Sequence, residues 1–231
     1  MAPSLPRLIQ YLLCTGLCVL VLLSTTAMAD GDWTLRKDED GIRIYTAPVP
    51  DSNFHAFRGE TRVESSLSTL MAVQADVAYV TEWLKDCDVS ELLTDFSPDG
   101  YYAYFQTRSP WPVKDRDYVL RYEIDQDPDS YTVKISFEAE VGMLPETDEC
   151  VRLTELSGYW ELTPVGPRET EVVYQVSADP GGNVPAWLAN RFVVDQPFYS
   201  LKRLRERTQL DKYKGTHFDF IEDPFQQDNS E

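Results

Sequence analysis

The sequence contains few of the side chains that enzymes most often use for catalysis. It has two histidines, His55 and His217, and no HExxH metal motif, paired CxxC, Walker loop or GxSxG nucleophile motif. A nucleophile–histidine pair or a metal site would have to use one of these histidines, which lie far apart in the chain. We therefore expect no enzymatic activity, no metal site and no cofactor.

Positive charge is also scarce. The chain has 21 Lys and Arg residues against 39 Asp and Glu residues, a formal net charge of −18. This balance excludes a typical nucleic-acid binder, which presents a basic face, and opposes general adsorption to anionic lipid headgroups. One segment, Lys202–Lys214, is rich in basic residues. Favourable charge at a helix C-terminus is the favoured reading of this segment, and a patch that touches a membrane is the alternative.

One long apolar run is present, Leu8–Leu23, and it follows Arg7 and precedes Ala27-Met28-Ala29. A positive residue, a short apolar run and an A-x-A site are typical of a secretory signal peptide. The run is shorter than the ~20 residues that span a bilayer, so an uncleaved anchor is the less favoured alternative. The sequence predicts cleavage after Ala29 and export to the periplasm or the cell exterior.

The remaining chain is predicted to hold one domain, residues 30–212, followed by an acidic tail, residues 213–231. Two cysteines remain after cleavage, Cys87 and Cys150. An even pair in an exported protein is compatible with a single disulfide, and the sequence leaves the bonded and free states equally open.

The hydrophobic periodicity predicts an α+β domain. Strands and hairpin turns occupy residues 33–65 and 90–179, and an Asp40-Gly41 dipeptide marks the first hairpin. Residues 66–86 change to helical periodicity, as one helix or as two short ones broken near residues 75–78. A long helix is expected over residues 184–210, with a kink or break at Pro197. This order predicts helices packed on one face of a curved antiparallel sheet.

Alternation along the strands shows which face is buried. Apolar and aromatic side chains alternate with polar ones in residues 118–124 and 131–139. The last helix carries a complementary apolar stripe, which is formed by Val184, Trp187, Leu188, Phe192, Val194, Phe198, Leu201 and Leu204. A sheet and a helix of this kind enclose either a solid core or a lidded pocket, and periodicity alone favours the core.

Five motifs in order give the chain a resemblance to the START (StAR-related lipid-transfer) domain family, whose bacterial exported members are the most similar. They cover most of residues 32–210 and read DGIRIY, TEWLKDC, SPWPVKDRDYV, SGYWELTPV and DPGGNVPAWLANRF. The resemblance implies a helix-grip fold, in which a curved antiparallel sheet wraps around a long C-terminal helix. It also implies a hydrophobic tunnel between the sheet and the helix for one lipid or sterol, which favours the pocket over the solid core.

The resemblance further implies that the C-terminal helix and a facing loop, here Met143–Cys150, act as the gate. The residues expected in the wall of the tunnel are Tyr122, Phe137 and Trp160, and those expected in the lid are Trp187, Leu188 and Phe192. The adjacent charges of Arg116 and Asp117 are expected to point to opposite faces of a strand and to pair separately.

The sequence therefore predicts a monomeric protein that binds a single lipid or sterol-like molecule and makes transient membrane contact. The prediction leaves open whether the protein also transfers this molecule. Two alternatives stay open. One is a cyclase- or hydratase-like enzyme of the wider helix-grip superfamily, which would use Tyr102, Tyr104 or Tyr122. The other is an interaction module whose interior is filled by its own side chains.

Overall fold

The computed structural model describes residues 33–52, 54–182 and 184–225. The chain divides into two compact units, Met1–Asp30 and Gly31–Glu231. The predicted signal peptide, residues 1–29, lies outside the described residues. Among the described residues, no helix is long and apolar enough to cross a membrane.

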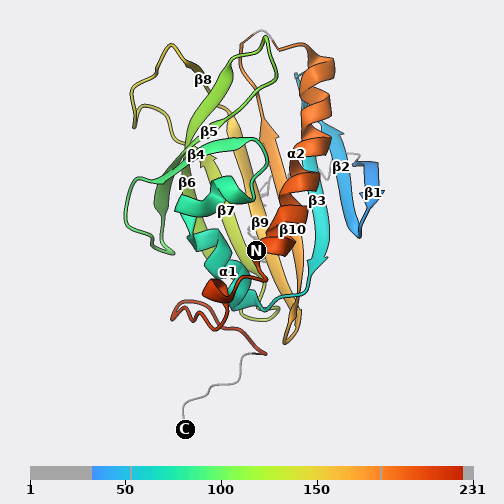
Figure 1. The fold of residues 1–231 in the computed structure, drawn as a ribbon, viewed down its shortest axis with the longest axis vertical. Helices are drawn as coiled ribbons and strands as arrows, with labels where there is room; N and C mark the ends of the chain where they lie inside the picture. The colour runs from blue at the N-terminus through green and yellow to red at the C-terminus, as the bar shows by residue number, and fades with distance from the viewer. Residues whose placement is uncertain (1–32, 53, 183, 226–231) are drawn as a thin grey trace, which may run out of the picture. The chain divides into compact units, whose positions relative to one another are not determined.

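The second unit is built on one ten-stranded sheet (Figure 1). The strands are paired in the order β1-β2-β3-β10-β9-β7-β6-β5-β4, and β8 pairs with β6 outside this path. All pairs are antiparallel except β6 with β8, which is parallel and departs from the expected meander. The strands are β1 (Thr34–Glu39), β2 (Ile42–Pro48), β3 (His55–Val63), β4 (Cys87–Leu92), β5 (Tyr101–Thr107), β6 (Asp115–Gln126), β7 (Val133–Ala139), β8 (Cys150–Arg152), β9 (Leu156–Gly166) and β10 (Glu169–Ala178).

The first hairpin forms where the sequence predicts it. Asp40 and Gly41 both have positive φ, 53° and 68°, between β1 and β2. Two consecutive positive φ values are typical of the type I′ turn, whose twist matches that of the two strands. Strand β3 in turn pairs with β10, so strands from the two ends of the sheet region lie side by side.

The helical segment between β3 and β4 forms two short helices, which is one of the two arrangements expected from the sequence. The α-helix α1 (Leu67–Ala75) is followed by the 3-10 helix η1 (Val77–Glu82), and Asp76 lies between them. Ser66 caps α1, because its hydroxyl accepts a hydrogen bond from the backbone N–H of Thr69. Nearly all of α1 is buried, as the apolar spacing requires.

The long helix α2 (Ala186–Arg207) packs across β2 and β3 (Figure 1). It is shorter at both ends than residues 184–210 and is continuous through Pro197, so the expected break does not occur. Gly59 on β3 allows the close approach of the helix. A Cβ atom at this position would lie 2.7 Å from Leu201 Cδ1, a distance that side chains do not tolerate.

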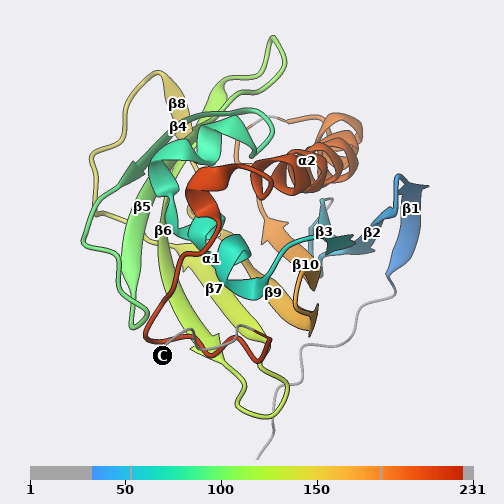
Figure 2. The same ribbon diagram turned by 60° about the horizontal axis from the view of Figure 1, so that its bottom comes forward.

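The chain after α2 returns to the body of the domain. The 3-10 helix η2 (Asp211–Tyr213) is followed by a segment that lies beside α1 at one end of the sheet (Figure 2). Tyr213 and Ile221 are buried, and Gln126 exchanges two hydrogen bonds with the backbone of Glu222. Residues 213–225 of the predicted acidic tail therefore pack against the domain, whereas residues 226–231 lie outside the described residues.

Most of the basic side chains of residues 202–214 have partners within the chain. Lys202 pairs with Asp40, Lys212 with Asp76 and Lys214 with Asp211, each at 2.7 Å. Arg205 donates hydrogen bonds to the carbonyl oxygens of Asp40 and Gly41. These side chains therefore hold the end of α2 on the first hairpin and on η1, which fits the favoured reading of the basic segment.

Candidate functional site

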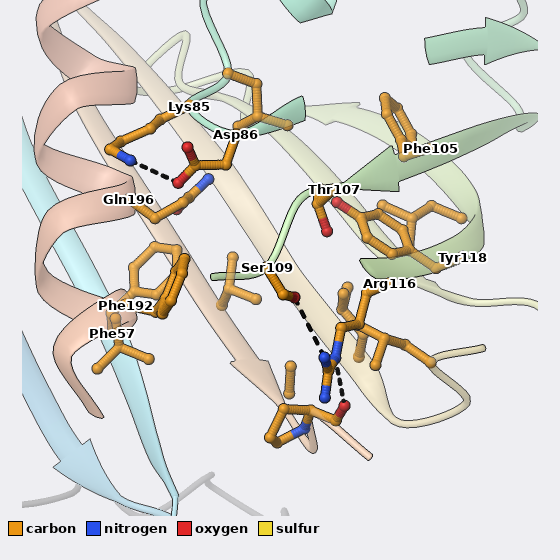
Figure 3. A pocket seen from close by; sticks show the side chains of 18 of the residues that line it. Phe57, Lys85, Asp86, Phe105, Thr107, Ser109, Arg116, Tyr118, Phe192 and Gln196 are labelled. Atoms are coloured by element: carbon orange, nitrogen blue, oxygen red, sulfur yellow. Dashed lines mark hydrogen bonds and ion pairs between the residues drawn. The ribbon is translucent and has the colours of Figure 1, made fainter. Parts of the chain in front are cut away.

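An apolar cavity of about 250 Å³ lies between the inner face of the sheet and α2 (Figure 3). Its wall is formed by side chains from β3, η1, β5, β6, β7, β9, β10 and α2, and by the segment between β5 and β6. Most of these side chains are aromatic or aliphatic. Small-molecule pockets commonly measure ~300–1,000 Å³, so the volume of the cavity in this conformation is just below that range.

The three residues predicted for the sheet wall all line the cavity. They are Tyr122 on β6, Phe137 on β7 and Trp160 on β9. Tyr122 and Phe137 are direct cross-strand partners with ring centroids 5.5 Å apart. Trp160 stacks on Tyr174 of β10 with centroids 3.7 Å apart. The strand periodicity therefore identified one continuous aromatic surface.

A glycine makes room for this aromatic surface. Gly158 on β9 is paired with Phe137, and a Cβ atom at this position would lie 2.7 Å from Phe137 Cζ and 2.2 Å from the backbone oxygen of Gln175. The glycine of the SGYWELTPV motif thus lets the Phe137 ring lie flat against the strand beside it.

Of the three residues predicted for the lid, Leu188 and Phe192 line the cavity and Trp187 does not. Trp187 is 70% exposed. The helical period explains the error: Leu188 and Phe192 are four residues apart and share one face, whereas Trp187 is rotated by about 100° from Leu188. The broad apolar stripe read from the sequence combined two different faces of α2.

The loop predicted as the gate also lies elsewhere. Within the described chain, the cavity wall includes none of residues 143–150. The carbonyl oxygens of Leu144 and Pro145 instead accept hydrogen bonds from Arg152. The loop that does line the cavity connects β5 to β6 and contributes Arg108, Ser109, Pro110 and Val113. We refer to residues 108–114 as the β5–β6 loop.

Arg116 on β6 joins the β5–β6 loop to the turn that precedes α2. Its guanidinium donates hydrogen bonds to the carbonyl oxygens of Pro180 at 3.0 Å and Gly181 at 3.1 Å. It also donates to Ser109 Oγ, at 3.2 Å (Figure 3), and to the carbonyl oxygen of Lys114. Burial lowers the pKa of Arg116, although an arginine so placed remains charged. Gly181, with φ of +61°, provides the left-handed turn residue that the DPGG motif predicts.

Arg116 and its neighbour Asp117 have separate partners, as the strand geometry predicts. Asp117 accepts two hydrogen bonds from Arg152, at 2.8 and 3.1 Å, and both side chains are buried. The Tyr104 hydroxyl donates to the same carboxylate, at 3.3 Å. Burial, and then the charge of Asp117, raise the pKa of Tyr104 to about 12. This cluster lies behind the sheet wall and does not line the cavity.

The two cysteines are free thiols, so the structure selects the unbonded option. Cys87 opens β4 and pairs with β5, whereas Cys150 opens β8 and pairs with β6. Burial raises the pKa of Cys87 to about 12, which keeps this thiol protonated.

One of the two histidines lines the cavity. His55 lines the cavity and its Nδ1 lies 2.8 Å from Asn190 Oδ1, while His217 is on the surface segment after η2. In the part of the chain that the structure describes, no three His, Cys, Asp or Glu side chains are close enough to hold a metal ion. The arrangement can enclose an apolar molecule.

An antiparallel sheet whose inner face and long C-terminal helix enclose an apolar cavity defines a helix-grip protein. The START domain model matches residues 17–214, which is most of the chain. The chain therefore belongs to the START domain family.

Several known proteins are similar to it. An uncharacterised protein of Pseudomonas aeruginosa is 38% identical over 178 residues, covering 77% of this chain and 87% of that protein. The solved STAR-related lipid transfer protein fragment of Xanthomonas axonopodis has 35% identity and a TM-score of 0.71, covering 77% of this chain and 99% of that one. The phosphatidylcholine transfer protein of Rattus norvegicus is 27% identical over 172 residues, covering 73% of this chain and 79% of that protein.

Sequence reasoning missed several residues of the wall. The β5–β6 loop and the anchoring role of Arg116 were not assigned, and neither were Tyr101 and Tyr174, although both line the cavity. The alternation of Tyr101, Ala103 and Phe105 on one face of β5 was a usable signal for Tyr101. No local signal indicates that Arg116 reaches a turn 64 residues further along the chain.

Proposed function

We propose that this protein binds a single lipid or sterol-like molecule in the cavity and carries it through water, without chemical change. One observation carries the proposal: the space between the sheet and α2 is an apolar cavity, not a filled core. Each CH₂ group moved from water into such a cavity contributes roughly 0.8 kcal/mol, so a chain of about ten groups is sufficient for useful affinity after the ordering cost. The lipid-transfer names of the START relatives support the same class of ligand.

The gate in this proposal consists of the N-terminal part of α2 and the β5–β6 loop. Leu188 and Phe192 cover the cavity from the helix, and Pro110 and Val113 cover it from the loop. Arg116 is hydrogen-bonded to both sides of this opening. Entry of a lipid then requires that the two sides separate, which breaks some of the hydrogen bonds of Arg116.

Transient membrane contact occurs at the same opening. Trp111 in the β5–β6 loop is 92% exposed, and Trp187 at the start of α2 is 70% exposed. Tryptophan is the residue most typical of membrane interfaces, because its ring is apolar and its N–H is polar. With a net charge of −18, the chain is suited to an uncharged or zwitterionic surface and not to an anionic one. We further propose that the predicted signal peptide directs export, so that the protein carries its ligand outside the cytoplasm.

A cavity-filling variant tests the binding role. Ala189 lines the cavity on α2, so Ala189→Trp should occupy the space and strongly reduce uptake of a fluorescent long-chain lipid from vesicles. Arg191→Trp is the matched control, because Arg191 lies on the exposed side of the same helix. Equal uptake by the two variants would contradict a ligand in this cavity.

A further inference from the structure

Two tyrosines in the cavity wall are paired across neighbouring strands. Tyr101 on β5 is the register partner of Tyr122 on β6, and their rings stack with 4.7 Å between centroids and 2° between planes. Both line the cavity, and Tyr101 is only 2% exposed. Within residues 33–52, 54–182 and 184–225, neither hydroxyl has a hydrogen-bond partner. Buried hydroxyls are as a rule hydrogen-bonded, so this pair calls for an explanation.

The other two tyrosines of the wall have a polar side chain beside the hydroxyl. Tyr118 lies next to Thr107, and Tyr174 lies next to Gln196. Burial raises the pKa of all four tyrosines, so their hydroxyls are uncharged. Burial is the largest cause of the raised pKa of Tyr122, followed by the neighbouring Tyr101, Tyr118, Tyr174 and Cys87.

The ionised residues of the wall are already engaged with partners of their own. Lys85 pairs with Asp86 at 2.6 Å, Arg108 pairs with Asp88 at 2.9 Å, and Arg116 is bonded to the β5–β6 loop and to the turn before α2. On β6, Tyr122 is six residues beyond Arg116, which corresponds to about 20 Å of extended strand. The tyrosine pair therefore forms the deep end of the cavity, away from the opening.

We propose that the hydroxyls of Tyr101 and Tyr122 form a polar subsite at the deep end of the cavity, and that this subsite binds an uncharged oxygen group of the lipid. The inference rests on the proposed lipid-binding function and specifies its ligand class. The group is a hydroxyl or an ester carbonyl, which can accept hydrogen bonds from the two phenols. The hydrocarbon part then lies along Trp160, Leu188 and Phe192.

An anionic group is disfavoured at this subsite. A carboxylate or phosphate moved into the apolar deep end would lose its hydration, and the described wall has no free cation there to compensate for that loss. An alkane leaves both phenols unpaired, as they are in the empty cavity. The subsite thus binds neutral oxygen-bearing lipids more tightly than charged lipids or plain hydrocarbons of the same length.

A chain-matched series of probes tests this selectivity. Dodecane, dodecanol, methyl dodecanoate and dodecanoate would each be titrated against purified protein loaded with the neutral fluorescent dye Nile red. We expect dodecanol and methyl dodecanoate to bind about ten-fold more tightly than dodecane, and more tightly than dodecanoate. In the Tyr101→Phe/Tyr122→Phe double variant, whose rings still stack, the affinity for dodecanol should fall to that for dodecane.

Tyr102→Phe is the control, because Tyr102 alternates with Tyr101 on β5 and does not line the cavity. It should keep the preference for dodecanol. Equal affinity for all four probes, or tighter binding of dodecanoate, would overturn the subsite and leave the lipid-binding function standing. Failure of every probe to displace the dye would overturn both.

Discussion

The Nε atom of Arg116 lies 3.0 Å from the carbonyl oxygen of Pro180, so strand β6 holds the turn that precedes α2. This contact joins two motifs that are 64 residues apart. It fixes the start of the helix over the cavity, and through Ser109 and Lys114 it fixes the loop on the other side of the opening.

Arg116→Met should weaken both the fold and the closure of the cavity. The substitution keeps an apolar stem but leaves the carbonyl oxygens of Pro180 and Gly181 without their donor. We expect a loss of about 1–3 kcal/mol in the free energy of unfolding, measured in urea, and faster release of a bound lipid. Arg121→Met is the control on the same strand, because Arg121 pairs only with Glu123 and Glu138 on the surface. A loss no larger than that of the control would show that Arg116 does not anchor the turn.

Gly158→Ala should destabilise the aromatic wall. The added methyl group would overlap the backbone oxygen of Gln175 and the ring of Phe137, so β9 or the ring must shift. We expect a loss of about 1–3 kcal/mol in unfolding free energy, together with a reduced affinity for lipid. Gly166→Ala on the same strand should have little effect, since its nearest neighbour would be 3.6 Å away. Similar stabilities for the two variants would count against the tight packing at Gly158.

Trp111→Ala should reduce association with zwitterionic vesicles. Removal of a large apolar side chain that would be buried in the interface should weaken binding about ten-fold, corresponding to ~1.4 kcal/mol. Vesicle co-sedimentation measures this change. Val165→Ala is the control, because Val165 is exposed near the end of β9 that is far from the opening. If vesicle binding is the same in the wild-type protein and in Trp111→Ala, the β5–β6 loop is not a membrane contact.

Cys87 should make stability fall at high pH. Its thiol ionises at its ordinary pKa of 9.0 when unfolded, and burial raises the pKa to about 12 in the folded state. The folded state therefore retains a proton that the unfolded state loses, so stability is fully present below about pH 9 and decreases as the pH rises toward the folded value. Urea unfolding at about pH 7 and about pH 10 should show a smaller decrease for Cys87→Ala than for the wild-type protein. An equal decrease in both would remove Cys87 as a source of this dependence.

Much of the fold could be predicted because its signals are local. The hairpin at Asp40-Gly41 and the inward faces of β6 and β7 depend on short-range chemistry, and the structure confirms them. Tyr122 and Phe137 could be placed on the wall for the same reason, because a strand alternates strictly between two faces, whereas Trp160 was placed there with the resemblance to the START domain family.

The predictions were wrong where contacts between residues far apart in the sequence determine the structure. The apolar stripe on the last helix was broad. The sequence therefore did not show whether Trp187 lies on the side of the helix that faces the sheet or on the side that faces solvent. The position of the β5–β6 loop beside α2 depends on the long-range hydrogen bonds of Arg116, and no periodicity in the sequence predicts these bonds. The burial of Ile221 in a segment read as an acidic tail depends on Gln126, which lies in a distant hairpin.

The most direct test of the central claim is the native mass of the protein after gentle purification. We predict a species heavier than the polypeptide by the mass of one lipid, which is released on denaturation and is lost in Ala189→Trp. A bare polypeptide mass that stays unchanged after incubation with lipid vesicles would contradict the claim that the space under α2 holds a ligand.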